Sequence, residues 1–140
     1  MKVSEMMKTA AVIIAPEASV GSAIKIMEEK RFRRLPVVKD GNLVGIITDL
    51  DIRKALNSPF VFHEAMYDEY LQNEIKVEAC MTPNPITVNP DSDILDAAVI
   101  MHKEKIGGLP VVEENRLAGI ITVSDLLEML IGFLGKEKQA

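Results

Sequence analysis

The sequence has few of the features that mark secreted, membrane-bound or nucleic-acid-binding proteins. Its single cysteine, Cys80, cannot form an internal disulfide, so a reducing intracellular setting is expected. No segment reaches the roughly 18 consecutive apolar residues of a membrane span, and the first residues lack the apolar stretch of a signal peptide. A formal net charge of −5 supplies no overall positive field for phosphates, which argues against non-specific binding to nucleic acid. The sequence therefore predicts a soluble cytoplasmic protein.

Motifs of catalysis and metal binding are also absent from the sequence. The two histidines, His63 and His102, stand far apart and lack the spacing of metal ligands. No nucleophile elbow, Walker loop or pair of acids at a catalytic spacing occurs. The sequence therefore predicts no metal site, no required cofactor and no enzyme.

What the sequence does contain is an internal repeat. The tetrapeptide LPVV at Leu35–Val38 recurs at Leu109–Val112, and GIITDLD at Gly45–Asp51 recurs as GIITVSD at Gly119–Asp125. The separation of Leu35 and Leu109, 74 residues, aligns the two copies without a gap from position 2 to the aspartates that end the motifs. A repeat of this length indicates two tandem structural units.

The repeat also predicts the domain boundaries. Residues 1–57 form the first unit and residues 76–133 the second, with a partly helical connector at 58–75 and a polar C-terminal tail at 134–140. The connector is too apolar for a flexible linker. We expect it to lie over the two units or to contact another subunit.

Each unit is predicted to run β-α-β-β-α. In the second unit, Pro85–Val88 is expected to be a short strand and Ile94–Lys105 a helix with one apolar face. LPVV and LAGIIT then form a hairpin around a tight turn at EENR, and a second helix begins near Asp125. The fold class is therefore α/β (α+β). Units this small bury little alone, so we expect them to pack together, sheet against sheet.

The ordered motifs of both copies resemble those of a pair of CBS domains, also called a Bateman module. The chain is most similar to stand-alone AcuB-like CBS proteins, which carry no attached effector domain. The resemblance implies two β-α-β-β-α CBS units packed sheet against sheet with pseudo-two-fold symmetry, and association as a homodimer. It also implies a regulatory module that binds AMP, ADP, ATP or S-adenosylmethionine in the cleft between the units and signals to an unknown protein target.

The repeated Thr-x-x-Asp pattern has a chemistry that suits a nucleoside. An aspartate in the first turn of a helix can accept two hydrogen bonds, which matches the paired hydroxyls of a ribose. The free amides at a helix N-terminus favour an anion such as phosphate. The same pattern is also a helix-capping arrangement, and the two roles are compatible.

The resemblance implies that one of the two sites is favoured. There, a nucleoside contacts the first strand, the residues before LPVV and the aspartate of one unit, and its phosphates reach the residues before LPVV of the other unit. Guanidinium groups match phosphate oxygens, and glycines leave room for a base. The favoured site then consists of Thr87, Gly107, Gly108, Thr122 and Asp125, with Arg33 and Arg34 facing the phosphates. A solvated basic helix end is the alternative role of the two arginines.

The second site, built on Thr48 and Asp51, is doubtful. Its own unit has arginines where a base would enter, and only glycines stand on its phosphate side. We expect this site to be empty or to take a different ligand. The alternative for the whole chain is a dimeric interaction scaffold with no ligand, and an enzyme acting on nucleotides is disfavoured because neither motif has a general base nearby.

Overall fold

The computed structural model describes residues 1–56 and 71–139, which form two compact units. The Asp51 unit comprises Val12–Pro85, and the Asp125 unit comprises Met1–Ala11 and Ile86–Ala140. The boundary falls at the same place in both repeats, because Val12 and Ile86 are equivalent under the repeat. The start of each sequence repeat therefore folds with the body of the other repeat.

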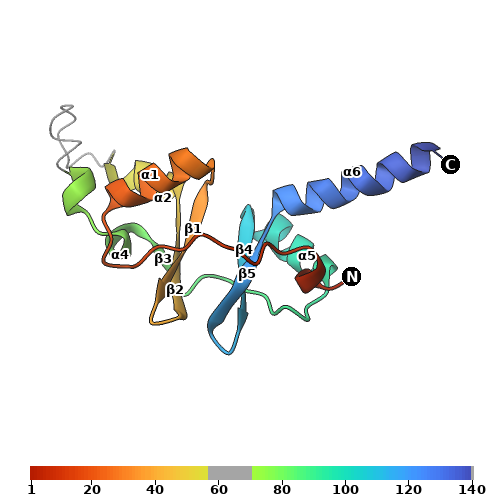
Figure 1. The fold of residues 1–140 in the computed structure, drawn as a ribbon, viewed down its shortest axis with the longest axis horizontal. Helices are drawn as coiled ribbons and strands as arrows, with labels where there is room; N and C mark the ends of the chain where they lie inside the picture. Colours follow the sequence, from red (N-terminus) through yellow and green to blue (C-terminus); the bar gives the residue numbers. More distant parts are fainter. Residues whose placement is uncertain (57–70, 140) are drawn as a thin grey trace. The chain divides into compact units, whose positions relative to one another are not determined.

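The Asp51 unit contains helices and one antiparallel sheet (Figure 1). Strand β2 pairs antiparallel with β1 on one side and with β3, from the second repeat, on the other. Its elements are α1 (Val20–Lys30), β1 (Arg34–Lys39), β2 (Asn42–Thr48), α2 (Asp49–Leu56), α4 (Val77–Cys80) and β3 (Thr82–Pro83).

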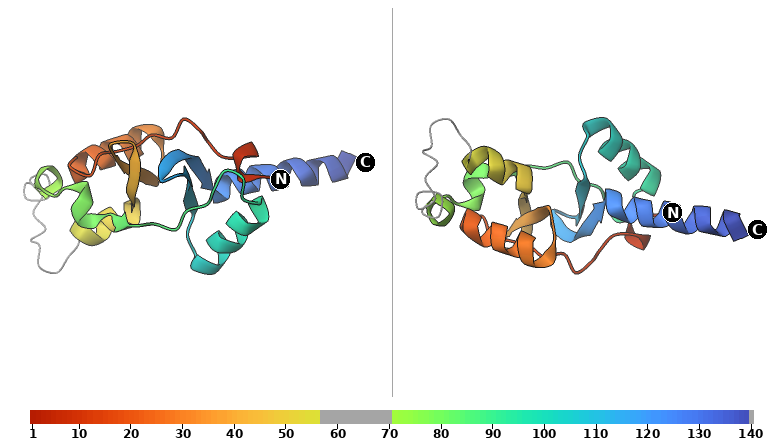
Figure 2. Two further views of the ribbon diagram at one scale, coloured as in Figure 1. Left: turned by 90° about the horizontal axis from the view of Figure 1, so that it is seen from below. Right: turned by 90° about the horizontal axis from the view of Figure 1, so that it is seen from above.

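The Asp125 unit repeats this arrangement with β4 and β5 as its antiparallel hairpin. The N-terminal segment runs beside this unit in each view (Figures 1 and 2), and Lys8 forms an antiparallel bridge with Ile120 of β5. The elements are η1 (Val3–Glu5), α5 (Ile94–Glu104), β4 (Gly108–Glu113), β5 (Arg116–Thr122) and α6 (Val123–Gln139). The mixed α/β class predicted from the sequence is confirmed. The strand predicted over Pro85–Val88 is reduced to one parallel bridge between Val88 and Val111.

The helix that precedes each hairpin begins and ends at equivalent residues of the two repeats. Ser19 caps α1 by accepting a hydrogen bond from the Ser22 amide, and Asp93 caps α5 through the Leu95 amide. Both helices end at a residue in the left-handed conformation, Arg31 at φ 58° and Lys105 at φ 55°. The helix boundaries are therefore part of the repeat.

Each hairpin turns through two residues with positive φ. These are Asp40 and Gly41 in the first hairpin and Glu114 and Asn115 in the second. Two central residues with positive φ are the mark of a type I′ turn, whose twist matches that of the flanking strands. The tight turn predicted at EENR is thus confirmed.

Each unit has its own hydrophobic core. Each core also contains a side chain from the start of the other sequence repeat, residues 1–11 or 76–85, which we call the exchanged segment. Val77 is completely buried in the Asp51 unit, and Val3 is completely buried in the Asp125 unit. The strands contribute Leu35, Val37 and Ile47 to one core and Leu109, Val111 and Ile121 to the other. Exchange of the N-terminal segments is therefore held by apolar burial as well as by backbone pairing.

Helix α6 is longer than its counterpart α2, with 17 residues against 8. Its C-terminal half lies beyond the hairpin of its own unit (Figure 2), and every residue from 130 to 139 is exposed. The exposed large apolar side chains of α6 are Val123, Leu127, Leu130, Ile131, Phe133 and Leu134. The tail predicted at 134–140 thus continues this helix as far as Gln139.

The predicted connector at 58–75 falls mostly outside the described residues. Residues 71–74 are helical, as expected, whereas residues 57–70, which include His63, are not described. No helix in the described part of the chain has the length and apolar character needed to cross a membrane.

Candidate functional site

Asp125 is the one buried polar or charged residue in the described ranges 1–56 and 71–139, with 3% of its surface exposed. It lies in the first turn of α6, directly after β5. A buried carboxylate is costly unless hydrogen bonds or a cation compensate it. The partners of Asp125 therefore show what the motif does in the free protein.

The Thr-x-x-Asp motif of the Asp125 unit forms a reciprocal capping box. Asp125 Oδ2 accepts hydrogen bonds from the Thr122 amide at 2.9 Å and from Thr122 Oγ1 at 3.1 Å, and the Asp125 amide donates to Thr122 Oγ1 at 3.4 Å. These bonds satisfy amides that the helix itself leaves without partners. The capping role predicted from the sequence is therefore present, and it uses only one of the two carboxylate oxygens.

The second oxygen of Asp125 faces a lysine from the exchanged N-terminal segment. Lys8 Nζ lies 3.6 Å from Asp125 Oδ1 and 3.9 Å from a carboxylate oxygen of Glu128. The Lys8 backbone is fixed by reciprocal hydrogen bonds with Ile120, of 2.8 and 3.0 Å. Sequence reasoning missed Lys8, because nothing in the spacing of the motifs indicates that the start of the first repeat folds against the second aspartate.

The Asp51 motif has the same capping box in a different setting. Asp51 Oδ2 accepts from the Thr48 amide at 3.0 Å, and the Asp51 amide donates to Thr48 Oγ1 at 3.1 Å. Asp51 is half-buried, and no basic group of the described residues lies within ion-pair distance of it. Thr82 stands at the position equivalent to Lys8 and pairs with Ile46. The two motifs therefore share a cap and differ in their counterion.

The glycine of each motif is required by the exchanged segment. A Cβ on Gly119 would lie 2.6 Å from the Lys8 carbonyl oxygen, and a Cβ on Gly45 would lie 2.9 Å from the Thr82 carbonyl oxygen. Real Cβ atoms do not approach oxygen so closely. The absence of a side chain at these two glycines therefore lets the backbone of the exchanged segment lie close to each hairpin.

The other predicted residues of the favoured site lie in the same unit as Asp125. Gly108 is directly opposite Thr122 in the β4–β5 pair, and the Gly107 carbonyl accepts a hydrogen bond from the Val123 amide at 2.9 Å. Thr87, half-buried, directly precedes Val88, whose amide donates to the Pro110 carbonyl. The glycines, Thr122 and Asp125 therefore gather where the hairpin meets α6, and Thr87 lies in the segment beside β4.

Arg33 and Arg34 belong to the Asp51 unit. The Arg33 carbonyl accepts from the Asp49 amide at 2.9 Å, and Arg34 lies opposite Thr48 in the β1–β2 pair. Burial lowers the pKa of the Arg34 guanidinium, against a smaller opposing effect from Asp49. Their role as phosphate ligands of the Asp125 motif stays a prediction.

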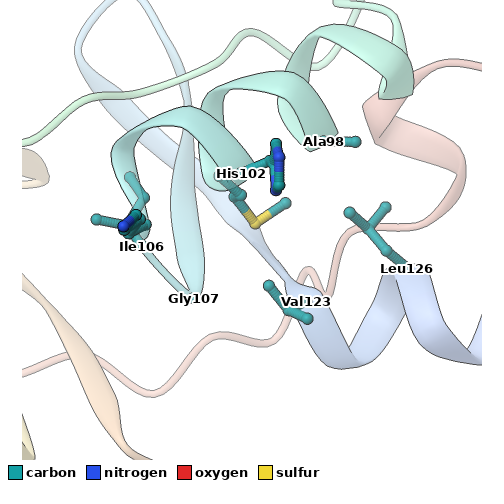
Figure 3. A pocket seen from close by; sticks show the side chains of 8 residues that line it. Ala98, His102, Ile106, Gly107, Val123 and Leu126 are labelled. Atoms are coloured by element: carbon teal, nitrogen blue, oxygen red, sulfur yellow. The ribbon is translucent and has the colours of Figure 1, made fainter.

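A surface hollow of about 500 Å³ lies between α5 and the start of α6 (Figure 3). Its lining is mainly apolar, and it shares only Gly107 with the predicted site. On α6 it is lined by Val123 and Leu126, and Asp125 is not part of the lining. Val123 and Asp125 are about 200° apart around a helix, so the Asp125 carboxylate points away from the hollow. The lining residues are Ala98, Met101, His102, Lys105, Ile106, Gly107, Val123 and Leu126.

The described residues contain no cluster of three or more acidic, histidine or cysteine side chains that could hold a metal ion. Hydroxyl groups and cations are the partners that such carboxylates accept.

This chain belongs to the CBS-domain family. The family model for the CBS domain matches twice, at residues 3–58 and 76–132. A CBS domain-containing protein of Dictyostelium discoideum is 39% identical over 135 residues, which cover 94% of this chain and 92% of that protein. Several longer relatives carry the names of enzymes, and this chain spans only 20–24% of their length.

Solved structures of similar proteins include two with adenosine-containing ligands. An AcuB protein from Vibrio cholerae has a TM-score of 0.83 at 28% identity, covering 100% of this chain and 97% of that protein. The CBS-domain pair of protein MJ0100, in complex with 5′-methylthioadenosine and S-adenosylmethionine, has a TM-score of 0.78 at 32% identity, covering 94% and 97%. CBSX2 in complex with AMP has a TM-score of 0.79 at 25% identity, again covering 94% and 97%.

Proposed function

We propose that this chain is a regulatory module that binds an adenosine-containing ligand, AMP, ADP, ATP or S-adenosylmethionine, at the Asp125 motif. The observation that carries the proposal is the buried Asp125 carboxylate, which keeps Oδ1 outside the capping box. A carboxylate oxygen free of the cap can accept hydrogen bonds from the vicinal hydroxyls of a ribose. The ligands of the MJ0100 and CBSX2 complexes, which all carry an adenosine group, support this chemistry.

Two further groups of residues complete the proposed site. The backbone at Gly107 and Gly108, which adjoins Thr122, is proposed to leave space for a base beside the motif. Arg33 and Arg34 are proposed to meet the phosphates of the ligand, where guanidinium groups bind well. Thr48 and Asp51 form the second, weaker candidate, since Asp51 is less buried and lies beside the arginines rather than glycines.

The proposed mechanism is a shift of population. A ligand that binds one conformation of the module better than another favours that conformation by the difference in binding free energy. The altered module would then contact its protein target, or a second copy of itself, differently. No step of catalysis is involved.

A thermal-shift series tests the proposal. Wild type, Asp125→Ala and Asp51→Ala are melted with AMP, ADP, ATP and S-adenosylmethionine, and Asp51→Ala is the matched control because it also removes a capping box. A ligand at 100 times its dissociation constant should stabilise the wild type by about 2.7 kcal/mol, a shift of several degrees. The shift should persist in Asp51→Ala and vanish in Asp125→Ala. The reverse pattern would contradict the assignment to Asp125.

The exposed apolar side of α6 favours a second candidate function, a dimeric interaction scaffold that needs no ligand. Exposed apolar side chains on one helix are a common feature of contact surfaces. This candidate predicts a stable homodimer and no thermal shift with any of the four ligands. Sedimentation of the Leu127→Lys variant beside the wild type would test whether α6 forms the contact.

A further inference from the structure

We propose that Lys8 is an internal competitor for the ligand of the Asp125 motif. Its ammonium group holds the one carboxylate oxygen of Asp125 that the capping box leaves available, Oδ1. The proposal rests on the proposed function, since it needs a ribose to bind at Asp125. It adds a residue that sets the affinity of the site, supplied by the exchanged segment of the other repeat.

The first step of the argument is that Oδ2 has no capacity left for a ligand. A carboxylate oxygen accepts about two hydrogen bonds, and Oδ2 already accepts two from Thr122. A ligand hydroxyl must therefore use Oδ1. The Asp125 side chain is only 4% exposed, and the Lys8 ammonium group lies 3.6 Å from Oδ1, the oxygen that such a hydroxyl would need.

The second step is that Lys8 is held at this place by its backbone and not by its side chain. The amide and the carbonyl of Lys8 both form hydrogen bonds with the backbone of Ile120, and Gly119 allows the Lys8 backbone to lie against the hairpin. The side chain itself is 63% exposed, so it can move away without unfolding the segment. Lys8 is thus tethered beside Asp125 and can still be displaced.

The third step compares the two motifs. Thr82 is the residue equivalent to Lys8 in the repeat, and it pairs with Ile46, the strand residue equivalent to Ile120. Its side chain is short and carries no charge, so it cannot act as a counterion. Within residues 1–56 and 71–139, therefore, only the Asp125 motif carries an internal cation. A ligand that binds there must replace the Lys8 contact. The free energy of that contact therefore reduces the binding free energy of the ligand.

The test is calorimetric titration with adenosine, a neutral ligand whose binding carries no charge of its own. Lys8→Thr, which copies the residue of the other repeat, should bind adenosine about two- to five-fold more tightly than the wild type, the range expected for an ion pair whose lysine is exposed to solvent. Lys2→Thr is the matched control. It removes one lysine from the same segment together with the Lys2–Asp91 ion pair, at 3.3 Å, and should leave adenosine affinity unchanged.

Salt supplies a second readout. Raising the ionic strength screens the Lys8–Asp125 contact. Adenosine should therefore bind the wild type more tightly at high salt than at low salt, whereas its binding to Lys8→Thr should depend little on salt. This trend is opposite to the one expected if Lys8 attracted an anionic ligand.

The outcomes separate this inference from the proposed function. If wild type binds adenosine, Asp125→Ala does not, and Lys8→Thr has unchanged affinity, the competition is disproved and the proposed site stands. Unchanged affinity at every salt concentration leads to the same conclusion. If Lys8→Thr and wild type both fail to bind adenosine, Lys8 is not what limits ribose binding and the competition is disproved. The thermal-shift series with AMP then decides the proposed function independently.

Discussion

The two Thr-x-x-Asp motifs have one backbone design and two electrostatic settings. Both aspartates close a capping box with the threonine three residues earlier. Asp125 is buried and paired with Lys8, whereas Asp51 is half-buried and has Thr82 at the equivalent position. The comparison teaches that a repeat preserves what the fold needs, the cap and the glycine, while the exchanged segment makes the two sites chemically different.

The largest expected loss of stability comes from substituting the glycine of either motif, Gly45 or Gly119, where the exchanged segment crosses the hairpin. Gly119→Ala should lower the free energy of unfolding by about 3 kcal/mol, because the new Cβ meets the Lys8 backbone oxygen at 2.6 Å. Gly45→Ala should cost less, about 2 kcal/mol, since its nearest atom is the movable sulfur of Met81. Urea titration of each variant measures the difference.

Gly132→Ala is the control for these two substitutions. Apart from its neighbours in the chain and the backbone of its own helix, no atom of the described residues lies within 4 Å of its added Cβ, and the residue is in the interior of α6. It should stabilise the protein by up to about 1 kcal/mol. Equal losses for Gly119→Ala and Gly132→Ala would contradict the crossing argument.

A second comparison uses the valines that the two units exchange. Val3→Ala should cost about 2 kcal/mol and loosen the Asp125 unit, because Val3 is completely buried in that core. Val77→Ala should cost about as much and loosen the Asp51 unit. Hydrogen exchange is the measurement: amides of α5 should exchange faster in the first variant and amides of α1 in the second. Loss of protection in the unit that carries the same sequence repeat would overturn the exchange.

The capping threonines, Thr122 and Thr48, allow the two motifs to be compared by smaller losses of stability. Thr122→Ala should lower stability by about 2 kcal/mol, and Thr48→Ala by about 1 kcal/mol. The difference is expected because the Thr122 hydroxyl also donates to the buried Asp125 carboxylate, which the substitution would leave with one bond fewer. Thermal unfolding of both variants tests this. A larger loss for Thr48→Ala would mean that burial of the aspartate does not decide the strength of the cap.

The smallest expected effect concerns the thiol of Cys80, which has no counterpart in the Asp125 unit because Met6 stands at the equivalent position. Burial, and secondly the negative charge of Asp51, raise the pKa of Cys80. Fewer thiolates are then present near pH 8, so Cys80 should react with a disulfide reagent more slowly than free cysteine. The rate should rise toward that of free cysteine only at higher pH. Asp51→Asn should move this profile slightly to lower pH, and an unmoved profile would show that Asp51 has no influence on the thiol.

Much of each unit could be predicted from the sequence because its signals are local. The apolar runs LPVV and LAGIIT and the turn residues Glu114 and Asn115 indicate the hairpin, and Asp93 marks the start of α5. The capping role of Thr122 and Asp125 also follows from their spacing alone. These features depend on contacts between residues that are close in the chain.

The features that the sequence did not predict depend on contacts between distant residues. The pairing of Lys8 with Ile120 and Asp125 joins segments more than a hundred positions apart, and no periodicity records it. The reduction of the predicted strand at Pro85–Val88 to one bridge is a second example, because the length of a strand depends on the pairing that the neighbouring strand, β4, allows. The sequence repeat therefore predicted the helices and hairpins well, but it did not predict that the two compact units exchange their first segments.

The exchange of N-terminal segments also determines the order in which the protein can fold during its synthesis. The Asp51 unit is one continuous stretch, Val12–Pro85, and is complete once that stretch has left the ribosome. The Asp125 unit needs both Met1–Ala11, which emerges before the Asp51 unit, and α6, which emerges after it. At about 5–20 residues per second, the Met1–Ala11 segment waits about 5 to 25 seconds for the rest of its core. During that interval Val3 has no core to enter, so the unit that holds the buried aspartate is the last to form.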